Sequence, residues 1–207
     1  MIERASAVAG IFRLSAITAA ALGLAVLEAG AAESTYTPLD RGKCRHEAGK
    51  EVEDYGVWRC KGFAGVGIYV TAGDQRSYVS FGPNAAREPA AKQTFAAFNS
   101  EGKTVEWRWE RSSGGKIRPF ATIVRWNTVV SADAEPVRGQ ILVVTRLGPG
   151  AVCHVGYVDA HANADAATLA QRIADQNAPG FRCSADKPVI LGIKGPGFSE
   201  PSGGSGE

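Results

Sequence analysis

The sequence TVEWRWERSSGGKIRPFATIVRW, residues 104–126, predicts a β-hairpin around which the rest of the chain is organised. From Val105 to Glu110, bulky apolar side chains alternate with charged ones, which is the two-residue period of a strand with one buried face. Gly114 and Gly115 suit the positive φ angles of a two-residue type I′ turn. This turn sets three cross-strand pairs on the bulky face: Trp109 with Phe120, Trp107 with Thr122, and Val105 with Val124.

The first 32 residues have the organisation of a signal peptide. A start containing Arg4 and Arg13 precedes an apolar run of 14 residues, Leu14 to Leu27, and small residues follow at 29–32. Since a transmembrane helix needs about 20 apolar residues, the run favours cleavage over a retained anchor. We therefore expect a periplasmic or secreted protein that is not inserted in the membrane after cleavage.

Charge and length narrow the class of protein further. The formal net charge is +2, and the predicted signal peptide contains as many acidic as basic residues, so the mature part keeps this charge. A charge this small creates no strong field toward nucleic acid or an anionic membrane. About 175 mature residues suit one domain, which we place at 33–194. Residues 195–207, rich in Gly, Ser and Pro, predict a disordered tail.

All four cysteines lie after the predicted cleavage site, and an even number in an exported chain indicates disulfides. Three connectivities exist. We favour Cys44 with Cys60 and Cys153 with Cys183, because each pair closes a local loop at one end of the domain. A zinc site is the alternative, but the cysteines lack C-x-x-C spacing.

The remaining pattern predicts an α+β, mainly β fold: six or seven antiparallel strands from hairpins, with one C-terminal helix packed on the sheet. The polar residues 33–40 are expected to be an irregular lead-in. Residues 140–147 are apolar on both faces, which is typical of a central strand covered on both sides. The helix is predicted at 163–177, capped by Asn163. Beside the 104–126 hairpin, the predicted strands are 56–60, 66–71, 76–81, 140–147, 151–158 and 189–193.

A basic surface beside aromatic residues is the first candidate site, because Arg and aromatic side chains are enriched where proteins meet proteins. A solvated polar face without a partner is the alternative interpretation. The charged members lie near the tip of the 104–126 hairpin and at a second turn: Asp74, Arg76, Arg108, Arg111, Lys116 and Arg118.

A second candidate site consists of His154, Asp159 and His161, since imidazole and carboxylate groups can move protons or bind metal. Their spacing matches no metal motif, and a partly buried His154 with a turn-forming Asp159 is the alternative. Alternation places His154 opposite a face formed by Cys153, Val155 and Tyr157. No G-x-S-x-G, H-E-x-x-H, P-loop or dinucleotide motif occurs in a usable context, so we expect no cofactor, no metal and no catalytic residue.

Four segments resemble a family of uncharacterised exported proteins common in alphaproteobacteria: WRCKGF at 58–63, GDQRSYVSFGPN at 73–84, RPFATIVRW at 118–126, and CHVGYVDA with the following helix at 153–175. The likeness extends over about residues 36–193 and implies a periplasmic location. In size, export and β content the chain is also similar to small periplasmic proteins such as lysozyme inhibitors, an analogy at the level of the fold alone.

Three functional hypotheses follow. The first is a non-catalytic binding or inhibitory module whose partner is a periplasmic protein or an envelope glycan. The second is a hydrolase acting on envelope material through His154 and Asp159, which requires both side chains to line one pocket. The third is a structural envelope protein without a specific ligand.

Overall fold

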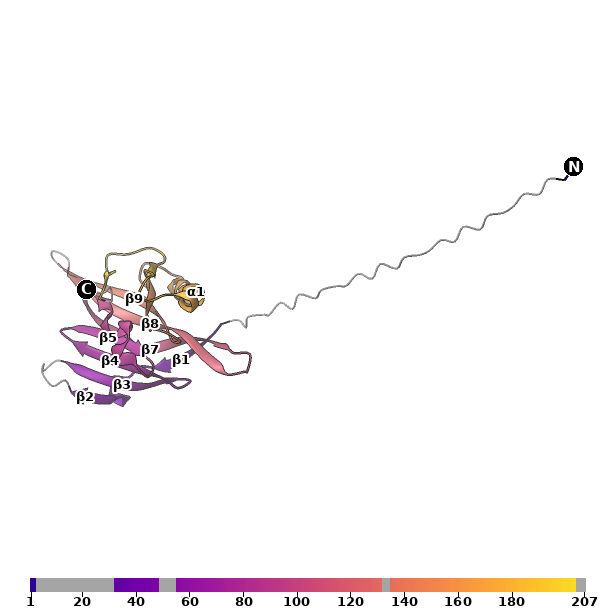
Figure 1. Ribbon diagram of the computed structural model, residues 1–207. Coiled ribbons are helices and arrows are strands. Elements are labelled where there is room, and N and C mark those ends of the chain that lie inside the picture. The colour runs from indigo at the N-terminus through magenta and orange to yellow at the C-terminus, as the bar shows by residue number, and fades with distance from the viewer. Residues whose placement is uncertain (3–31, 49–54, 132–134, 204–207) are drawn as a thin grey trace.

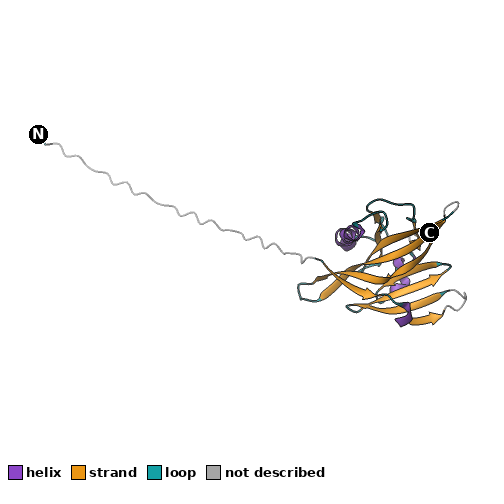
Figure 2. Ribbon diagram, turned by 180° about the vertical axis from the view of Figure 1, so that it is seen from behind, coloured by secondary structure: helices purple, strands orange, loops and turns teal. Residues whose placement is uncertain are grey.

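The computed structural model describes residues 1–2, 32–48, 55–131 and 135–203. The predicted α+β, mainly β fold is confirmed, because two packed sheets contain about half of these residues and one α-helix lies on the larger sheet (Figures 1 and 2). The predicted signal peptide falls almost entirely outside the described ranges and stays a prediction. Among the described residues, no helix is long and apolar enough to cross a membrane.

The larger sheet has the strand order β1-β7-β8-β9-β10-β11. Its neighbours are antiparallel except for β10 and β11, which are parallel. The six strands are β1 Glu33–Pro38, β7 Phe98–Arg111, β8 Ile117–Ser131, β9 Pro136–Arg146, β10 Cys153–Asp159 and β11 Val189–Ile190.

A four-stranded antiparallel sheet, ordered β2-β3-β4-β5, packs on one face of the larger sheet. Its strands are β2 Arg45–Ala48, β3 Gly56–Phe63, β4 Val66–Gly73 and β5 Arg76–Phe81. A two-stranded ladder joins β6 Thr94–Phe95 to β12 Pro201–Ser202. The helical elements are α1 Ala166–Asn177 and the 3₁₀ turns η1 Arg41–Lys43, η2 Ala85–Arg87, η3 Pro89–Lys92 and η4 Ala178–Gly180.

Two hydrophobic clusters lie on opposite faces of the larger sheet. The first, between the sheets, contains Trp107, Trp126, Phe81 and Phe95. The second, beneath α1, contains Leu142 and Val144 of β9. Because Ile141 and Val143 belong to the first cluster, the prediction of a strand covered on both faces is confirmed for β9. Figure 1 shows α1 on one side of β8 and β9 and strands β2 to β5 on the other.

The hairpin of β7 and β8 has two of the three predicted pairs, Val105 with Val124 and Trp107 with Thr122. The third is wrong, because Trp109 pairs with Pro119 and a β-bulge follows in β8. An extra residue in one strand disturbs the alternation of side chains. Phe120 therefore packs with Ala121 in the cluster beneath α1 and not on the tryptophan face.

The turn explains the bulge. Ser112 N donates to Lys116 O (2.9 Å) and Gly115 N donates to Ser112 O (2.8 Å), which makes a three-residue loop in place of the predicted two-residue turn. Only the second glycine has a positive φ, +74° at Gly115. Because the longer loop shifts the register by one residue near the tip, the bulge restores the register expected for the rest of the hairpin.

The predicted irregular lead-in and the predicted disordered tail need correction. Residues 33–38 are not an irregular lead-in, because they form β1 and pair with β7 from Glu33–Trp109 to Pro38–Thr104. The predicted disordered tail is wrong for residues 195–203, because Ser199 is buried, Thr128 Oγ1 donates to Gly197 O (2.8 Å) and β12 pairs with β6. Residues 204–207 lie outside the described ranges. Polar backbone partners, which composition does not reveal, order both segments.

The helix begins three residues later than predicted, and Asn163 does not cap it. The Asn163 side chain donates to Asp159 O and Ile193 O (both 2.8 Å) and accepts from Ile193 N (2.9 Å). It therefore holds the C-terminal segment against the end of β10. Ala166, Ala170, Ile173 and Ala174 form the buried stripe of α1, as the spacing predicts.

Both predicted disulfides are confirmed. Cys44–Cys60 joins the start of the four-stranded sheet to β3, and Cys153–Cys183 joins β10 to the segment after α1. The structure thus excludes the zinc alternative. Two disulfides are typical of an oxidising compartment outside the cytosol.

Candidate binding pocket

A cavity of about 930 Å³ lies where four segments of the chain meet. Its walls come from η3, from the start of β10 and the end of β9, from the 181–188 loop, and from the C-terminal segment at Pro201 and Gly203. The Cys153–Cys183 disulfide fixes the loop to β10. The walls of the cavity are therefore held in place by a disulfide and by the hydrogen bonds of β-sheets.

The outer edge of β10 explains why space remains here. β11 pairs only with Gly156 and Tyr157, so the first half of β10 has no neighbouring strand on that side. Side chains near η3 take over the backbone groups: Val152 N donates to Glu88 Oε2 and His154 N donates to Gln93 Oε1, both at 2.8 Å. These backbone N–H groups therefore have hydrogen-bond partners without a neighbouring strand, and the cavity lies in the space beside this edge.

His154 is one of the residues that line the cavity, but it is only 1% exposed, so its imidazole lies behind the cavity surface. Its Nδ1 lies 3.1 Å from the Tyr157 hydroxyl, and its Nε2 has no hydrogen-bond partner among the described residues. Burial lowers the pKa of His154 from 6.5 to about 3 and raises the pKa of Tyr157. Both side chains are therefore neutral at pH 7.

A β-bulge places Tyr157 beside this imidazole. The register of β10 against β9 shifts between His154 and Gly156. As a result Cys153 and Val155 pack beneath α1, whereas Tyr157 packs on the opposite face with His154. The predicted face of Cys153, Val155 and Tyr157 is wrong for Tyr157, because simple alternation does not anticipate a bulge.

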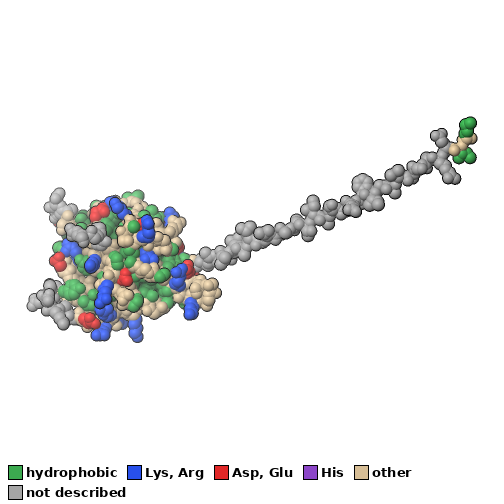
Figure 3. Space-filling model, in the orientation of Figure 1, with side chains coloured by type: hydrophobic (Ala, Val, Ile, Leu, Met, Phe, Trp, Pro, Cys, Tyr) green, Lys and Arg blue, Asp and Glu red, His purple; other side chains and the backbone are tan. Residues whose placement is uncertain are grey.

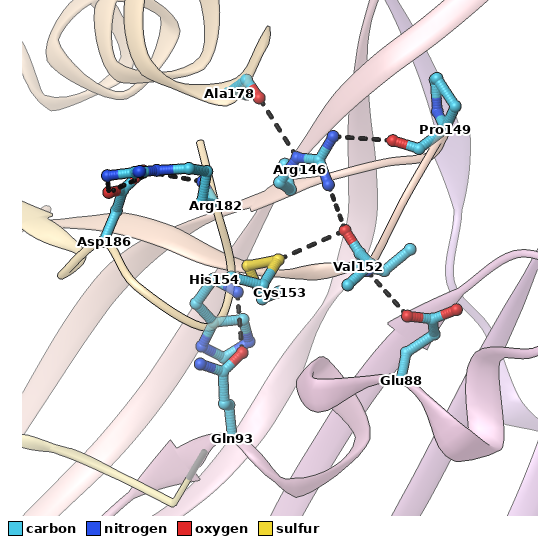
Figure 4. Close-up of a disulfide and its surroundings, with 12 residues drawn as sticks. Glu88, Gln93, Arg146, Pro149, Val152, Cys153, His154, Ala178, Arg182 and Asp186 are labelled. Atoms are coloured by element: carbon cyan, nitrogen blue, oxygen red, sulfur yellow. Dashed lines mark hydrogen bonds and ion pairs between the residues drawn. A yellow bond between two sulfur atoms is a disulfide. The ribbon is translucent and has the colours of Figure 1, made fainter. Parts of the chain in front are cut away.

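Cations dominate the charged groups that line the cavity: Arg146, Arg182 and Lys187, against the single carboxylate of Asp186. Figure 4 shows Arg146, Arg182 and His154 grouped around the disulfide. Arg146 donates to three backbone carbonyls, those of Ala178 (3.3 Å), Pro149 (2.9 Å) and Ala151. It thereby ties the end of α1 to the β9–β10 turn.

The structure does not assemble His154, Asp159 and His161 into one site. Asp159 is 2% exposed, and its carboxylate accepts from the backbone N of His161 (2.9 Å), Ala162 (3.0 Å) and Gly195 (2.8 Å). His161 is exposed and borders another depression, beside Phe98 and Gly139. Asp159 is a turn-forming residue, as the alternative interpretation held, and it does not line the pocket that contains His154.

The predicted basic surface is also divided. Arg108 is 8% exposed and pairs with Asp175 of α1 (2.6 Å), so it is not a surface residue. Arg118 pairs with Glu110, and Arg76 pairs with Asp74 (2.9 Å) at the other turn. Arg111 and Lys116 are exposed at the hairpin tip. In the face that Figure 3 shows, Lys and Arg side chains are scattered and do not form one patch.

Sequence reasoning missed most of this pocket. Of its members, only His154 and Cys183 stood out, one as a histidine and one as a cysteine. The confirmed disulfide was the available signal, because it predicts that residues around Cys183 lie against the start of β10. In the part of the chain that the structure describes, no cluster of His, Cys, Asp and Glu could hold a metal ion.

Comparisons with known proteins give no relative. No protein-family model matches the chain, and neither the curated proteins nor the solved structures contain a significant match. The function is therefore argued from the residues of this chain.

Proposed function

We propose that this protein is an exported, periplasmic, non-catalytic binding module that holds a small ligand in the cavity beside β10. The observation that carries the proposal is the concavity itself, which distant parts of the chain line with mostly apolar surface and a few charged side chains. A concave, mostly apolar site with a few polar groups is typical of ligand binding.

The architecture around the cavity supports binding by a preformed site. The disulfide holds the 181–188 loop on one side, and β12 holds the C-terminal segment on the other through its pairing with β6. Because these walls are already ordered, little binding free energy is lost in ordering the site when a ligand binds. The two disulfides agree with the exported location that the N-terminal sequence predicts.

Catalysis by the hydrolase hypothesis is supported less well. A general acid or base must reach the reacting atoms and titrate near the working pH. His154 has a pKa of about 3, so its imidazole is uncharged at the working pH. The Asp159 carboxylate accepts hydrogen bonds from three backbone N–H groups and does not line the cavity. A purely structural role predicts no ligand and does not account for the cavity.

Nuclear magnetic resonance would test the proposal. The ¹⁵N-labelled mature chain, residues 33–207, is titrated with soluble fragments from digested cell-wall glycan. We expect amide shifts confined to residues 152–157 and 181–188, while the β2–β3 region around Cys44–Cys60 stays unchanged as an internal control. Shifts on the four-stranded sheet alone, or none anywhere, would defeat the proposed site.

A further inference from the structure

Positive charges outnumber negative charges among the residues that line the cavity. Asp186 is already engaged by Arg182: its Oδ1 accepts from Nη2 (2.7 Å) and Nε (3.2 Å), and its Oδ2 accepts from the backbone N (2.8 Å). Arg146 and Lys187 have no carboxylate within 4.0 Å among the described residues. The cavity therefore carries an excess of positive charge that the protein itself does not neutralise.

Two of these cations differ in availability. Three of the five N–H groups of Arg146 are taken by carbonyls, and its strand position places it on the α1 side of the sheet. Lys187 is exposed, makes none of the side-chain hydrogen bonds found in the described structure, and lies on the loop above the β10 edge. Lys187 is thus free to contact a ligand, whereas Arg146 adds to the local potential.

The rest of the cavity lining offers a ligand little charge. Phe181 and Pro188 contribute apolar surface. The imidazole of His154 lies 3.1 Å from the Tyr157 hydroxyl and is buried, so a ligand in the cavity does not reach it. The exposed ammonium of Lys187 is therefore the charged group that a ligand can contact.

We propose that the pocket takes a small ligand that bears a carboxylate or phosphate group, with Lys187 pairing with the anion and Arg146 adding to the positive potential of the cavity. The proposal rests on the proposed function and specifies its ligand chemistry. Unpaired cations in a concave surface concentrate anions, and hydrogen bonds to a charged acceptor are stronger than neutral ones.

Three matched probes test the ligand class: N-acetylmuramic acid carries a carboxylate, N-acetylglucosamine 6-phosphate a phosphate, and N-acetylglucosamine neither. By isothermal titration calorimetry at low salt, we expect at least one acidic probe to bind about tenfold or more tightly than the neutral sugar, a difference of about 1.4 kcal/mol. Which acid binds identifies the anionic group. Adding 150 mM NaCl should weaken the preference.

Two variants locate the interaction. Lys187→Glu should lower the affinity for the acidic probe about tenfold, whereas Lys116→Glu, the same charge change at the exposed hairpin tip, should leave it within about twofold. In the ¹H–¹⁵N spectrum of the wild-type protein, the backbone amide of Lys187 should shift more on addition of the acidic probe than on addition of the neutral sugar. This second readout needs no substitution.

The results separate this inference from the broader proposal. Equal affinity for acidic and neutral sugars, with shifts in the cavity, would overturn the anion while leaving the binding function intact. Equal losses in the two lysine variants, or an unmoved Lys187 amide signal with bound acid, would also overturn it. Failure of all three probes contradicts the anionic site, and the wall-fragment titration then decides separately whether the cavity binds anything.

Discussion

The two faces of the larger sheet are built from different chemistry, and β7 shows the contrast within two residues. Trp107 faces the four-stranded sheet, is 0% exposed, and meets Phe81 edge to face at 5.5 Å. Arg108, its neighbour, faces α1 and joins Asp175 and Ser34 in a polar network. One side is held by aromatic bulk, and the other mainly by aliphatic side chains together with a partly buried ion pair.

This difference has a consequence for how residues are interpreted from sequence. Alternation correctly separates Trp107 from Arg108, but it does not tell whether the polar face meets water or a helix. Gln171 Nε2 donates to Glu106 Oε1 (2.7 Å), so β7 has two polar side chains engaged by α1. A charged side chain opposite a buried one is exposed only if no later element covers it.

Truncation of the aromatic face should have the largest effect. We expect Trp107→Ala to lower the free energy of unfolding by about 3–5 kcal/mol, because it opens a cavity and removes a hydrogen bond from Nε1 to Thr37 Oγ1 (2.8 Å). Urea denaturation followed by circular dichroism measures it. Trp58→Ala, at a half-buried position stacked on His46, is the matched control and should cost less than half as much. Equal costs would mean that the sheet interface is not the main core.

The ion pair beneath α1 should come next. We expect Arg108→Ala to cost about 2 kcal/mol, less than a fully buried pair, because the Asp175 side chain is 36% exposed. Arg118→Ala, which breaks the exposed pair with Glu110 in the same hairpin, should change stability by at most about 0.5 kcal/mol. The same denaturation measurement compares them. If both variants are neutral, Arg108 does not hold the helix.

Acid should lower the free energy of unfolding through protonation of His154, which packs on the aromatic face. The unfolded chain binds a proton near pH 6.5, whereas the folded chain does so only near pH 3, so stability is complete above 6.5 and falls as the pH drops toward 3. One proton corresponds to a slope of about 1.4 kcal/mol per pH unit. Unfolding free energies measured from pH 7 to 4.5 should lose this component in His154→Gln. The exposed His161→Gln is the control, and parallel slopes in all three proteins would contradict the assignment.

Sequence patterns predicted the individual strands and disulfides better than the contacts between distant segments. Alternation identified β3, β4, β5, β7, β8 and β10, an apolar run identified β9, and cysteine spacing identified both disulfides, because these signals are local or nearly so. Sequence patterns did not predict β1 or the order of residues 195–203, which depend on partners far along the chain. The pocket was missed for the same reason. Its walls are brought together by topology, and no single segment carries its pattern.

The hairpin tip gives the smallest effect and tests the register directly. Since only Gly115 has a positive φ, Gly115→Ala should cost about 1 kcal/mol, whereas Gly114→Ala should be neutral or stabilise slightly by restricting the unfolded chain. Neither added methyl group would meet an atom within 4 Å, so sterics do not confuse the comparison. Thermal and urea unfolding of the two variants measure the difference. Equal destabilisation would instead indicate the two-residue turn, in which both glycines need positive φ, and would move Phe120 back opposite Trp109.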